Sequence, residues 1–595
     1  MKIQKHILLQ IFLFLLLSAG AQTPDARTEK LRAAVTYLAS EELGGRKSGT
    51  DGDSLAAVFI RNKLVENGAV LMGNNGFQYF GIVSDIKSGE GNKLKVDGVD
   101  FEAGKDFQPF SFSASASLEA SVIFAGFGIS GSSGDLKWDD FADQDLKGKW
   151  VLVLRGDPEP DNAGSAFIPM ATDRAKALTV RDRGAAGILL VSPSSIDKND
   201  QPVDITFDKT VSDAGIPVIS LTRKTASYIL GLQPTAIDSL EKAMIAGKIP
   251  ARIEVKKKVN GTADVVRKKV TTRNIVALIP GNDPILKNEY IAIGAHYDHL
   301  GMGGSGSGSR VPDLNAVHGG ADDNASGVAA LLEMTSYFSA ESNRPARSLL
   351  IIAFGAEEMG ILGSKYFVGH CPVDIRSVKG MVNMDMVGRM SKDTPILTVS
   401  GTGTFTLADS LIDRLSANRP FQVKKSPDGY GPSDHAAFYG EGIPVLFLTT
   451  GAHEDYHTPD DLAERINYEG QTRVIDFAES IVTSLSAMNP APAFREAGSR
   501  KESGNYGRGL KVTLGIMPDV SGAETSGGMK VEGTRKDGPA QKAGMIKGDI
   551  ITAINGLPVS NIYDYMSRLG KLKPGETVNV EVLREGKKEI LIIQL

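Results

Sequence analysis

The chain has very little cysteine. Its 595 residues include one cysteine, Cys371, so no disulfide can form within the chain. Large extracellular proteins without disulfides depend on their hydrophobic cores for stability. Hydrophobic residues make up 41% of the sequence, as in ordinary soluble globular proteins. The length predicts two to four domains, and we expect Cys371 to pack as a small apolar side chain.

The sequence also lacks an excess of positive charge. Lysine and arginine number 66 against 71 aspartates and glutamates, which gives a formal net charge of -5. A nucleic-acid-binding protein carries a basic footprint, so we expect no nucleic-acid partner. Beyond the N-terminus the chain has no apolar run long enough to span a bilayer, and we expect no stable membrane anchor.

The N-terminus has the layout of a secretion signal. Lys2 and Lys5 precede an apolar stretch at residues 7–17, and the small residues Ala19, Gly20 and Ala21 follow. The alternative is a membrane anchor, but the apolar stretch is shorter than the roughly 20 residues that a spanning helix needs. We therefore predict a signal peptide at residues 1–21 and a secreted or periplasmic protein.

Changes in sequence texture divide the rest of the chain. Helical periodicity comes first, then short β-rich runs, then apolar strands that alternate with helices, and finally a second β-rich stretch after a polar linker. We predict an α/β fold with a mostly parallel sheet covered by helices on both faces, a β-rich insert and a β-rich C-terminal domain. The predicted divisions are residues 24–106 and 268–490 for the α/β domain, 107–262 for the insert, 491–507 for the linker and 508–595 for the last domain.

Acidic and histidine side chains follow the apolar strands of the α/β segment. In such folds ligands bind beyond the carboxyl ends of the strands. Several charged groups at one edge would repel each other unless a cation were bound among them. Histidine and carboxylate ligands together suit zinc, and five of them suit two ions that share a bridging carboxylate. The residues in question are His296, Asp298, Asp322, Glu357, Glu358, Asp385 and His457.

The stretch GADDNASG at residues 320–327 precedes an apolar helix. Asp and Asn side chains cap helix N-termini, and one such residue would be enough for that purpose. We predict that Asp323 and Asn324 shape the turn and cap the helix, whereas Asp322 bridges the two ions.

Five motifs in this order, GAHYDH, GADDNASG, GAEEMG, NMDMVG and DYHTPDD, resemble the di-zinc exopeptidase family of bacterial leucyl aminopeptidases. Glutamate carboxypeptidases and glutaminyl cyclases are relatives of that family. The resemblance implies two Zn²⁺ ions and a zinc-exopeptidase fold, with Glu357 as general base and Asp298 as the carboxylate that orients His296. It also implies that Tyr456 stabilises the oxyanion and that His435 contacts substrate. The ligands it implies are His296, Asp322, Glu358, Asp385 and His457.

Two further resemblances concern the β-rich segments. GAAGILLV and its flanking strands, within residues 107–262, are similar to the protease-associated domain. GPAQKAGMIKGDIITAINGLPV, near the C-terminus, resembles a bacterial PDZ domain. The PDZ resemblance implies that the loop of Leu514, Gly515 and Ile516 offers backbone N–H groups to the C-terminus of a peptide or protein.

We therefore predict a zinc-dependent aminopeptidase that removes N-terminal residues from peptides. One alternative is a carboxypeptidase of the same fold, which needs cationic groups placed for a substrate carboxylate. The other alternative is a catalytically silent peptide-binding protein. We expect the remaining histidines of this segment to be ordinary loop or structural residues, namely His299, His318, His370 and His453.

Overall fold

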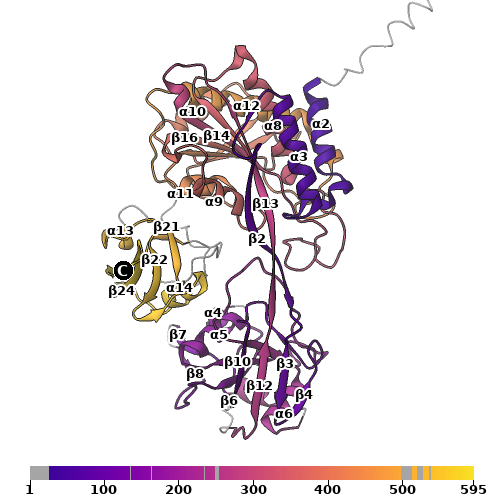
Figure 1. The fold of residues 1–595 in the computed structure, drawn as a ribbon, viewed down its shortest axis with the longest axis vertical. Coiled ribbons are helices and arrows are strands. Elements are labelled where there is room, and N and C mark those ends of the chain that lie inside the picture. Colours follow the sequence, from indigo (N-terminus) through magenta and orange to yellow (C-terminus); the bar gives the residue numbers. More distant parts are fainter. Residues whose placement is uncertain are drawn as a thin grey trace, which may run out of the picture.

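The computed structural model describes most of the chain. The described residues are 26–133, 136–162, 164–233, 235–247, 253–497, 512–518, 527–534 and 538–595. The predicted signal peptide and most of the predicted linker lie outside them. Three larger sheets organise the described residues. We call the parts built on them the large unit, the insert and the C-terminal unit (Figure 1).

The large unit contains a nine-stranded sheet in the order β1-β13-β15-β14-β16-β19-β17-β18, with β2 also paired to β13. Its four central strands, β15, β14, β16 and β19, are parallel. The pairs β13–β15, β1–β13, β2–β13 and β17–β19 are antiparallel, whereas the outer pair β17–β18 is parallel. The sheet is therefore mixed, and a mostly parallel sheet is not confirmed. The strands are β1 (Val70–Leu71), β2 (Phe77–Ser88), β13 (Val265–Ile279), β14 (Tyr290–His296), β15 (Ser348–Phe354), β16 (Val378–Met384), β17 (Ile396–Ser400), β18 (Gln422–Ser426) and β19 (Val445–Thr449).

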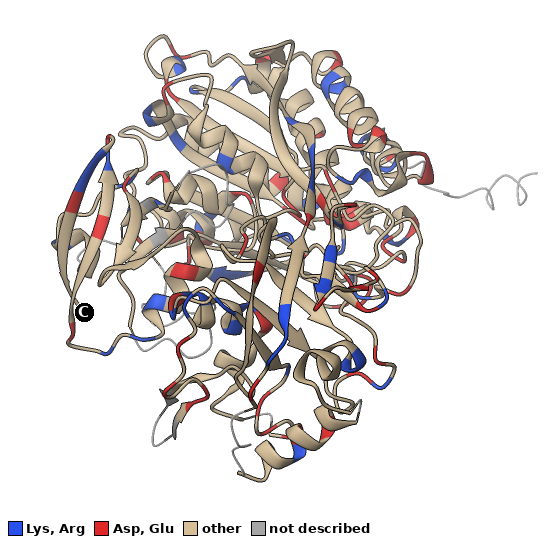
Figure 2. Cartoon of the chain, turned by 60° about the horizontal axis from the view of Figure 1, so that its bottom comes forward, with Lys and Arg blue, Asp and Glu red and all other residues tan. Residues whose placement is uncertain are grey.

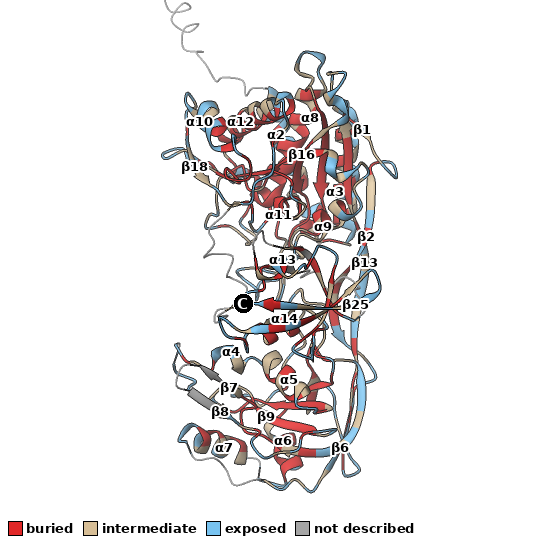
Figure 3. Cartoon of the chain, turned by 90° about the vertical axis from the view of Figure 1, so that its left-hand side faces the viewer, coloured by how far each residue is buried: buried red, intermediate tan, exposed pale blue. Residues whose placement is uncertain are grey.

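Helices cover both faces of this sheet because its central strands are apolar on both sides. Ile291 and Ile293 of β14 belong to one hydrophobic cluster, whereas Ala292 between them belongs to another on the opposite face. Every residue of β15 is buried, as Figure 3 shows for the centre of the sheet. The first face packs against α2 (Ala26–Leu38), α3 (Asp51–Glu66), α8 (Gly327–Ser339), α10 (Ala408–Ser416) and α12 (Tyr468–Ala487), and the second against α9 (Leu362–Gly369) and α11 (His435–Gly440).

The insert has its own eight-stranded sheet in the order β4-β3-β12-β6-β9-β10-β11-β5. This sheet starts earlier in the chain than residue 107, because residues 93–101 supply two of its strands. The long antiparallel strands β2 and β13 run between the insert and the large unit (Figure 1). The elements of the insert are β3 (Lys93–Val96), β4 (Val99–Phe101), β5 (Phe107–Pro109), β6 (Ala116–Phe124), β9 (Trp150–Leu154), α4 (Ile168–Ala171), α5 (Asp173–Asp182), β10 (Gly187–Val191), β11 (Val218–Leu221), α6 (Arg223–Leu230), α7 (Ala236–Ile245) and β12 (Lys258–Ala263), with the small pair β7 (Ser130–Ser133) and β8 (Leu136–Asp139).

The C-terminal unit is a six-stranded sheet with two helices, and it lies beside the insert (Figure 1). Its helix α14 contacts α5 of the insert through buried ion pairs. Arg181 Nη2 is 2.7 Å from Asp564 Oδ1, and Arg568 pairs with Asp182. The elements are β20 (Ile516–Pro518), β21 (Met529–Thr534), α13 (Pro539–Lys542), β22 (Ile550–Ile554), β23 (Leu557–Pro558), α14 (Ile562–Leu569), β24 (Thr577–Arg584) and β25 (Lys587–Gln594).

Charged side chains of both signs are interspersed over all three units (Figure 2). The small negative net charge therefore does not come from one acidic segment. Among the described residues, no helix combines the length and the apolar character that crossing a membrane requires. Cys371 is half-buried beside the second hydrophobic cluster of the large unit.

Candidate metal centre

The carboxyl ends of three neighbouring parallel strands bring the predicted side chains together. β14 ends at His296, β15 is followed by Glu357 and Glu358, and β16 is followed by Asp385. In the register of the sheet, His296 lies opposite Phe354 of β15. Because the strands are parallel and adjacent, their ends meet at one edge, as the sequence pattern predicts.

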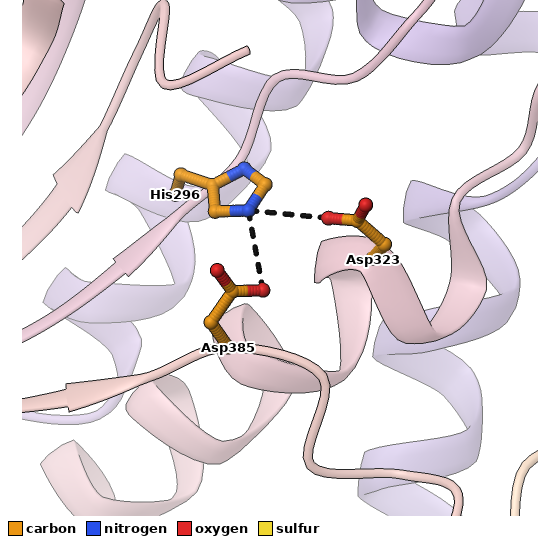
Figure 4. A group of neighbouring side chains, drawn as sticks. All are labelled: His296, Asp323 and Asp385. Carbon is orange, nitrogen blue, oxygen red and sulfur yellow. Dashed lines mark ion pairs between the residues drawn. The ribbon is translucent and has the colours of Figure 1, made fainter. Parts of the chain in front are cut away.

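Asp323 lies at the centre of this edge. Its Oδ1 is 3.2 Å from His296 Nε2, and its Oδ2 is 3.1 Å from His457 Nε2. His296 Nε2 is also 3.4 Å from Asp385 Oδ1, and Figure 4 shows this first group of three. His457 Nε2 is 3.4 Å from Glu358 Oε1. The first donor group is His296, Asp323 and Asp385, and the second is His457, Glu358 and Asp323. The two groups thus share the carboxylate of Asp323.

Asp322 does not occupy the position that the sequence predicted for it. Its Oδ1 accepts a hydrogen bond from the N–H of Gly388 at 2.6 Å, and its Oδ2 is 3.3 Å from His453 Nε2. The prediction is therefore wrong by one residue: Asp323 is the shared carboxylate, and Asp322 ties the loop to the segment after β16. Successive side chains of this turn diverge, because Asp323 (φ −105°, ψ 92°) and Asn324 (φ −132°, ψ 42°) both leave the helical conformation.

The turn that carries Asp323 is held by a second aspartate that the sequence analysis did not identify. The N–H groups of Asp322 and Asp323 both donate to the buried carboxylate of Asp461 at 3.0 Å. The predicted capping role falls to Asn324 alone, whose Oδ1 accepts from the N–H of Gly327 at 2.9 Å. These hydrogen bonds fix the backbone of the turn that carries Asp323.

His299 lies at the site, although the sequence suggested an ordinary loop residue. Its ring is buried, and its Nδ1 is 2.9 Å from Glu358 Oε1 and 3.8 Å from Asp323 Oδ2. The sequence did contain a signal for His299, because this residue lies two positions after Tyr297 in the run that directly follows β14. His318, by contrast, hydrogen-bonds Ser309 Oγ at 2.8 Å within its loop and is a loop residue as predicted.

Glu357 and Asp298 lie beside the first donor group. Glu357 Oε2 is 4.0 Å from His296 Nε2, and the backbone N–H of Glu357 donates to Asp298 Oδ1 at 2.9 Å. His296 Nδ1 is 3.2 Å from the carbonyl oxygen of Asp298 and 3.9 Å from its Oδ1. Ser48 Oγ donates to the other carboxylate oxygen of Asp298 at 2.9 Å. The main-chain carbonyl of Asp298 thus lies within hydrogen-bond distance of the imidazole of His296, whereas its carboxylate holds the backbone of Glu357. Orientation of His296 by that carboxylate stays a prediction.

Tyr456 and His435 differ in their access to the site. The ring of Tyr456 stacks on His457 at 3.8 Å between centroids. His435 is fully buried and stacks on Phe447 at 4.5 Å, and burial lowers its pKa to about 3. A contact between His435 and substrate stays a prediction. Ser433 is nearer to the centre, since its Oγ donates to Asp385 Oδ2 at 2.8 Å.

The charges around the centre fit a bound cation. Burial disfavours ionised carboxylates, yet Asp323, Asp385, Glu357, Glu358 and Asp434 gather within the same region. Burial raises the pKa of Glu357 well above its usual range, and the neighbouring carboxylates of Asp434 and Glu358 add to this effect. Imidazole and carboxylate donors within mutual reach form a ligand set typical of zinc.

Comparison with known proteins identifies the parts of the chain. The family model described as "Peptidase family M28" matches residues 274–482, a PA domain model matches residues 119–229, and a PDZ domain model matches residues 512–595. The uncharacterized protein YfbL of Escherichia coli (strain K12) is 30% identical over 236 residues, which cover 34% of this chain and 68% of YfbL. The chain belongs to peptidase family M28.

Other relatives of this M28 peptidase carry an activity in their names. Aminopeptidase YwaD of Bacillus subtilis (strain 168) is 24% identical over 460 residues, or 74% of this chain and 82% of YwaD. A solved zinc aminopeptidase from Bacillus subtilis superposes with a TM-score of 0.46 at 22% identity, covering 78% of this chain and 95% of that one. Across four curated relatives the chain spans between 66% and 82% of their own length.

Proposed function

We propose that this M28 peptidase is a zinc-dependent aminopeptidase with two metal positions. The observation that carries the proposal is the carboxylate of Asp323, with one oxygen facing His296 and the other facing His457. A carboxylate that is shared between two donor groups is what a two-ion site requires. The names of relatives such as YwaD support the choice of peptide N-termini as substrates.

The residues fall into two ligand sets. His296, Asp323 and Asp385 would hold one zinc ion. Asp323, Glu358 and His457 would hold the other, with His299 beside them. Bound zinc acts as a Lewis acid that lowers the pKa of water and polarises a carbonyl group.

Glu357 is suited to move the proton in this reaction. Burial and the neighbouring carboxylates raise the pKa of Glu357 above its usual range, and a raised pKa makes a carboxylate a stronger proton acceptor. The hydrogen bond from its backbone N–H to Asp298 fixes its place beside His296. Glu357 would take the proton of the attacking water and deliver it to the leaving amine. Tyr456, whose ring stacks on His457, would donate to the oxyanion.

Metal content and end-blocked substrates together test the proposal. Purified protein should contain two zinc ions per chain and should hydrolyse leucyl-p-nitroanilide but not its N-acetylated form. A carboxypeptidase would instead cleave N-acetylated peptides and spare peptides with an amidated C-terminus. A silent binding protein would cleave neither substrate. If the proposal is right, zinc added to the apo protein should restore hydrolysis of leucyl-p-nitroanilide.

The C-terminal unit offers a second position for peptide binding. In the PDZ domain, Gly515 has φ +72° and lies directly before β20 (Ile516–Pro518). Its N–H donates to Thr513 Oγ1 at 3.0 Å, and Leu514 is buried. We propose that this loop and β20 bind the C-terminus of a peptide or protein. Titration of C-terminally free and amidated peptides into the protein, followed by fluorescence anisotropy, would reveal whether the free carboxylate is needed.

We also propose a secreted or periplasmic location on the basis of residues 1–21. The mature N-terminus should then be Gln22. N-terminal sequencing of protein recovered from the cell exterior or periplasm would test this, and an intact Met1 on membrane-bound protein would contradict it.

A further inference from the structure

A cavity of about 180 Å³ lies next to the metal centre on its Glu358 side. Five parts of the chain line it: residues 47–48, the strand β2, the loop after β14, residues 358–359 after β15, and residues 205–209 of the insert, which lie between β10 and β11. Asp298, His299 and Glu358 face it from the centre. The insert thus contributes directly to the surroundings of the reacting atoms, although it contains none of the predicted ligands.

Lys209 carries a positive charge from the insert to this cavity. Its Nζ is 4.0 Å from Glu358 Oε2 and its side chain is 27% exposed. Gly308 fits between Lys209 and His457, because a Cβ there would be 3.2 Å from Lys209 Nζ and 3.6 Å from His457 Nδ1. The main chain before Lys209 is fixed by the same loop, since a Cβ at Gly306 would overlap the carbonyl oxygen of Phe207.

A second lysine, Lys47, lines the same cavity. It packs its stem against Gly301, and no carboxylate of the described residues lies within ion-pair distance of its ammonium group. The nearby acids are already engaged: Asp298 accepts from Ser48 Oγ and from the N–H of Glu357. Asp85 accepts from the N–H of Ile86 and pairs with Lys87.

We propose that this cavity binds a carboxylate of the substrate through Lys209 and Lys47. The inference rests on the proposed peptidase function and names its substrate class. When zinc is bound, the charge of Glu358 is shared with the ion, which leaves the ammonium group of Lys209 without a strong partner. A substrate carboxylate would supply that partner as a charge-assisted hydrogen bond. The carboxylate could be an acidic side chain or the C-terminus of a short peptide.

Paired substrates separate the two sources. Leucyl-glutamate amide against leucyl-glutamine amide tests an acidic side chain after the cleaved bond, and glutamyl- against glutaminyl-p-nitroanilide tests one before it. Leucyl-leucine against leucyl-leucine amide tests the terminal carboxylate. In at least one pair, the zinc-loaded wild type should prefer the carboxylate member, and Lys209→Met should reduce the ratio of kcat/KM values roughly tenfold or more.

The matched control is Lys224→Met, which removes an exposed lysine elsewhere in the insert. It should leave every ratio at the wild-type value, whereas Lys47→Met should lower the same ratio as Lys209→Met by a smaller factor. Equal ratios in wild type and Lys209→Met, with a lowered Tm, would show that Lys209 only joins the insert to the large unit, and would overturn the inference. Hydrolysis of none of the substrates by zinc-loaded wild type would instead overturn the proposed function.

Discussion

The large unit and the insert both contain buried parallel strands, but these strands end differently. In the insert, β9 is followed by Arg155, whose guanidinium donates to Asp173 at 2.9 and 2.7 Å and to Ser192 at 3.1 Å. β11 is followed by Thr222, which caps α6 through the N–H of Thr225 at 3.2 Å. Each of these two polar side chains of the insert has an oppositely charged or a neutral hydrogen-bond partner.

In the large unit, by contrast, several negatively charged side chains gather near the strand ends. Asp323, Asp385 and Glu358 surround two imidazoles, and both carboxylate oxygens of the buried Asp434 lack a hydrogen-bond partner among the described residues. Buried charges normally find partners. The comparison therefore teaches that strand ends indicate a functional site when several carboxylates gather there, and indicate structure when each charged group has its own oppositely charged partner.

The largest loss of activity is expected when the shared carboxylate is replaced. Asp323→Asn should lower the zinc content and reduce kcat/KM by roughly a thousandfold or more, because both donor groups lose a charged ligand. Asp322→Asn is the matched control, since an amide can still accept from Gly388 N–H and donate toward His453. Elemental analysis and kinetics measure both effects, and a larger loss in Asp322→Asn would restore the assignment made from sequence.

Removal of the proposed base should have the next largest effect. Glu357→Gln keeps the size of the side chain and the backbone hydrogen bond to Asp298, but the amide cannot take a proton. We expect kcat to fall by roughly a hundredfold to ten-thousandfold with the zinc content unchanged. Retention of more than a tenth of the wild-type kcat would assign the proton transfer to another group.

Burial of His435 should make the stability of the protein sensitive to acid. His435 has a folded-state pKa of about 3 against an unfolded value near 6.5. The unfolded chain binds the proton first, so stability is lost as the pH falls from about 6.5 to 3, by on the order of 3–5 kcal/mol.

His435→Gln should flatten that part of the pH dependence in urea unfolding of the zinc-free protein. The matched control is His370→Gln, which removes an exposed histidine. His370→Gln should leave the pH dependence of the unfolding free energy unchanged. An unchanged pH dependence in His435→Gln would contradict the assignment.

The smallest effect is expected at a strand end of the insert. The buried Lys176 donates from Nζ to the carbonyl oxygens of Leu154 and Gly156 at 2.6 Å, and burial lowers its pKa to about 7. Lys176→Met should cost about 1–3 kcal/mol of unfolding free energy, because two buried acceptors lose their donor. Calorimetry should show a lower Tm with normal zinc content, whereas a loss of zinc would mean that this edge is not purely structural.

Much of the fold followed from local pattern. Apolar runs separated by amphipathic helices predicted the central strands and their covering helices, because burial on both faces leaves no polar position in a strand. The antiparallel flanks were not predicted. β13 is apolar where residues 275–279 pair with β15, and the direction of a strand is set by the connections around it rather than by its composition.

The sequence by itself determined which residue types gather at the centre, and it supplied four of the five side chains now proposed as ligands, because these follow apolar strands. Only the tertiary structure decided between Asp322 and Asp323, added His299, and brought Lys209 of the insert to the same cavity. The physical reason is that neighbouring residues in a turn share one sequence pattern but point in different directions. Contacts between segments about 150 residues apart, such as Lys209 and Glu358, leave no periodic trace in the sequence.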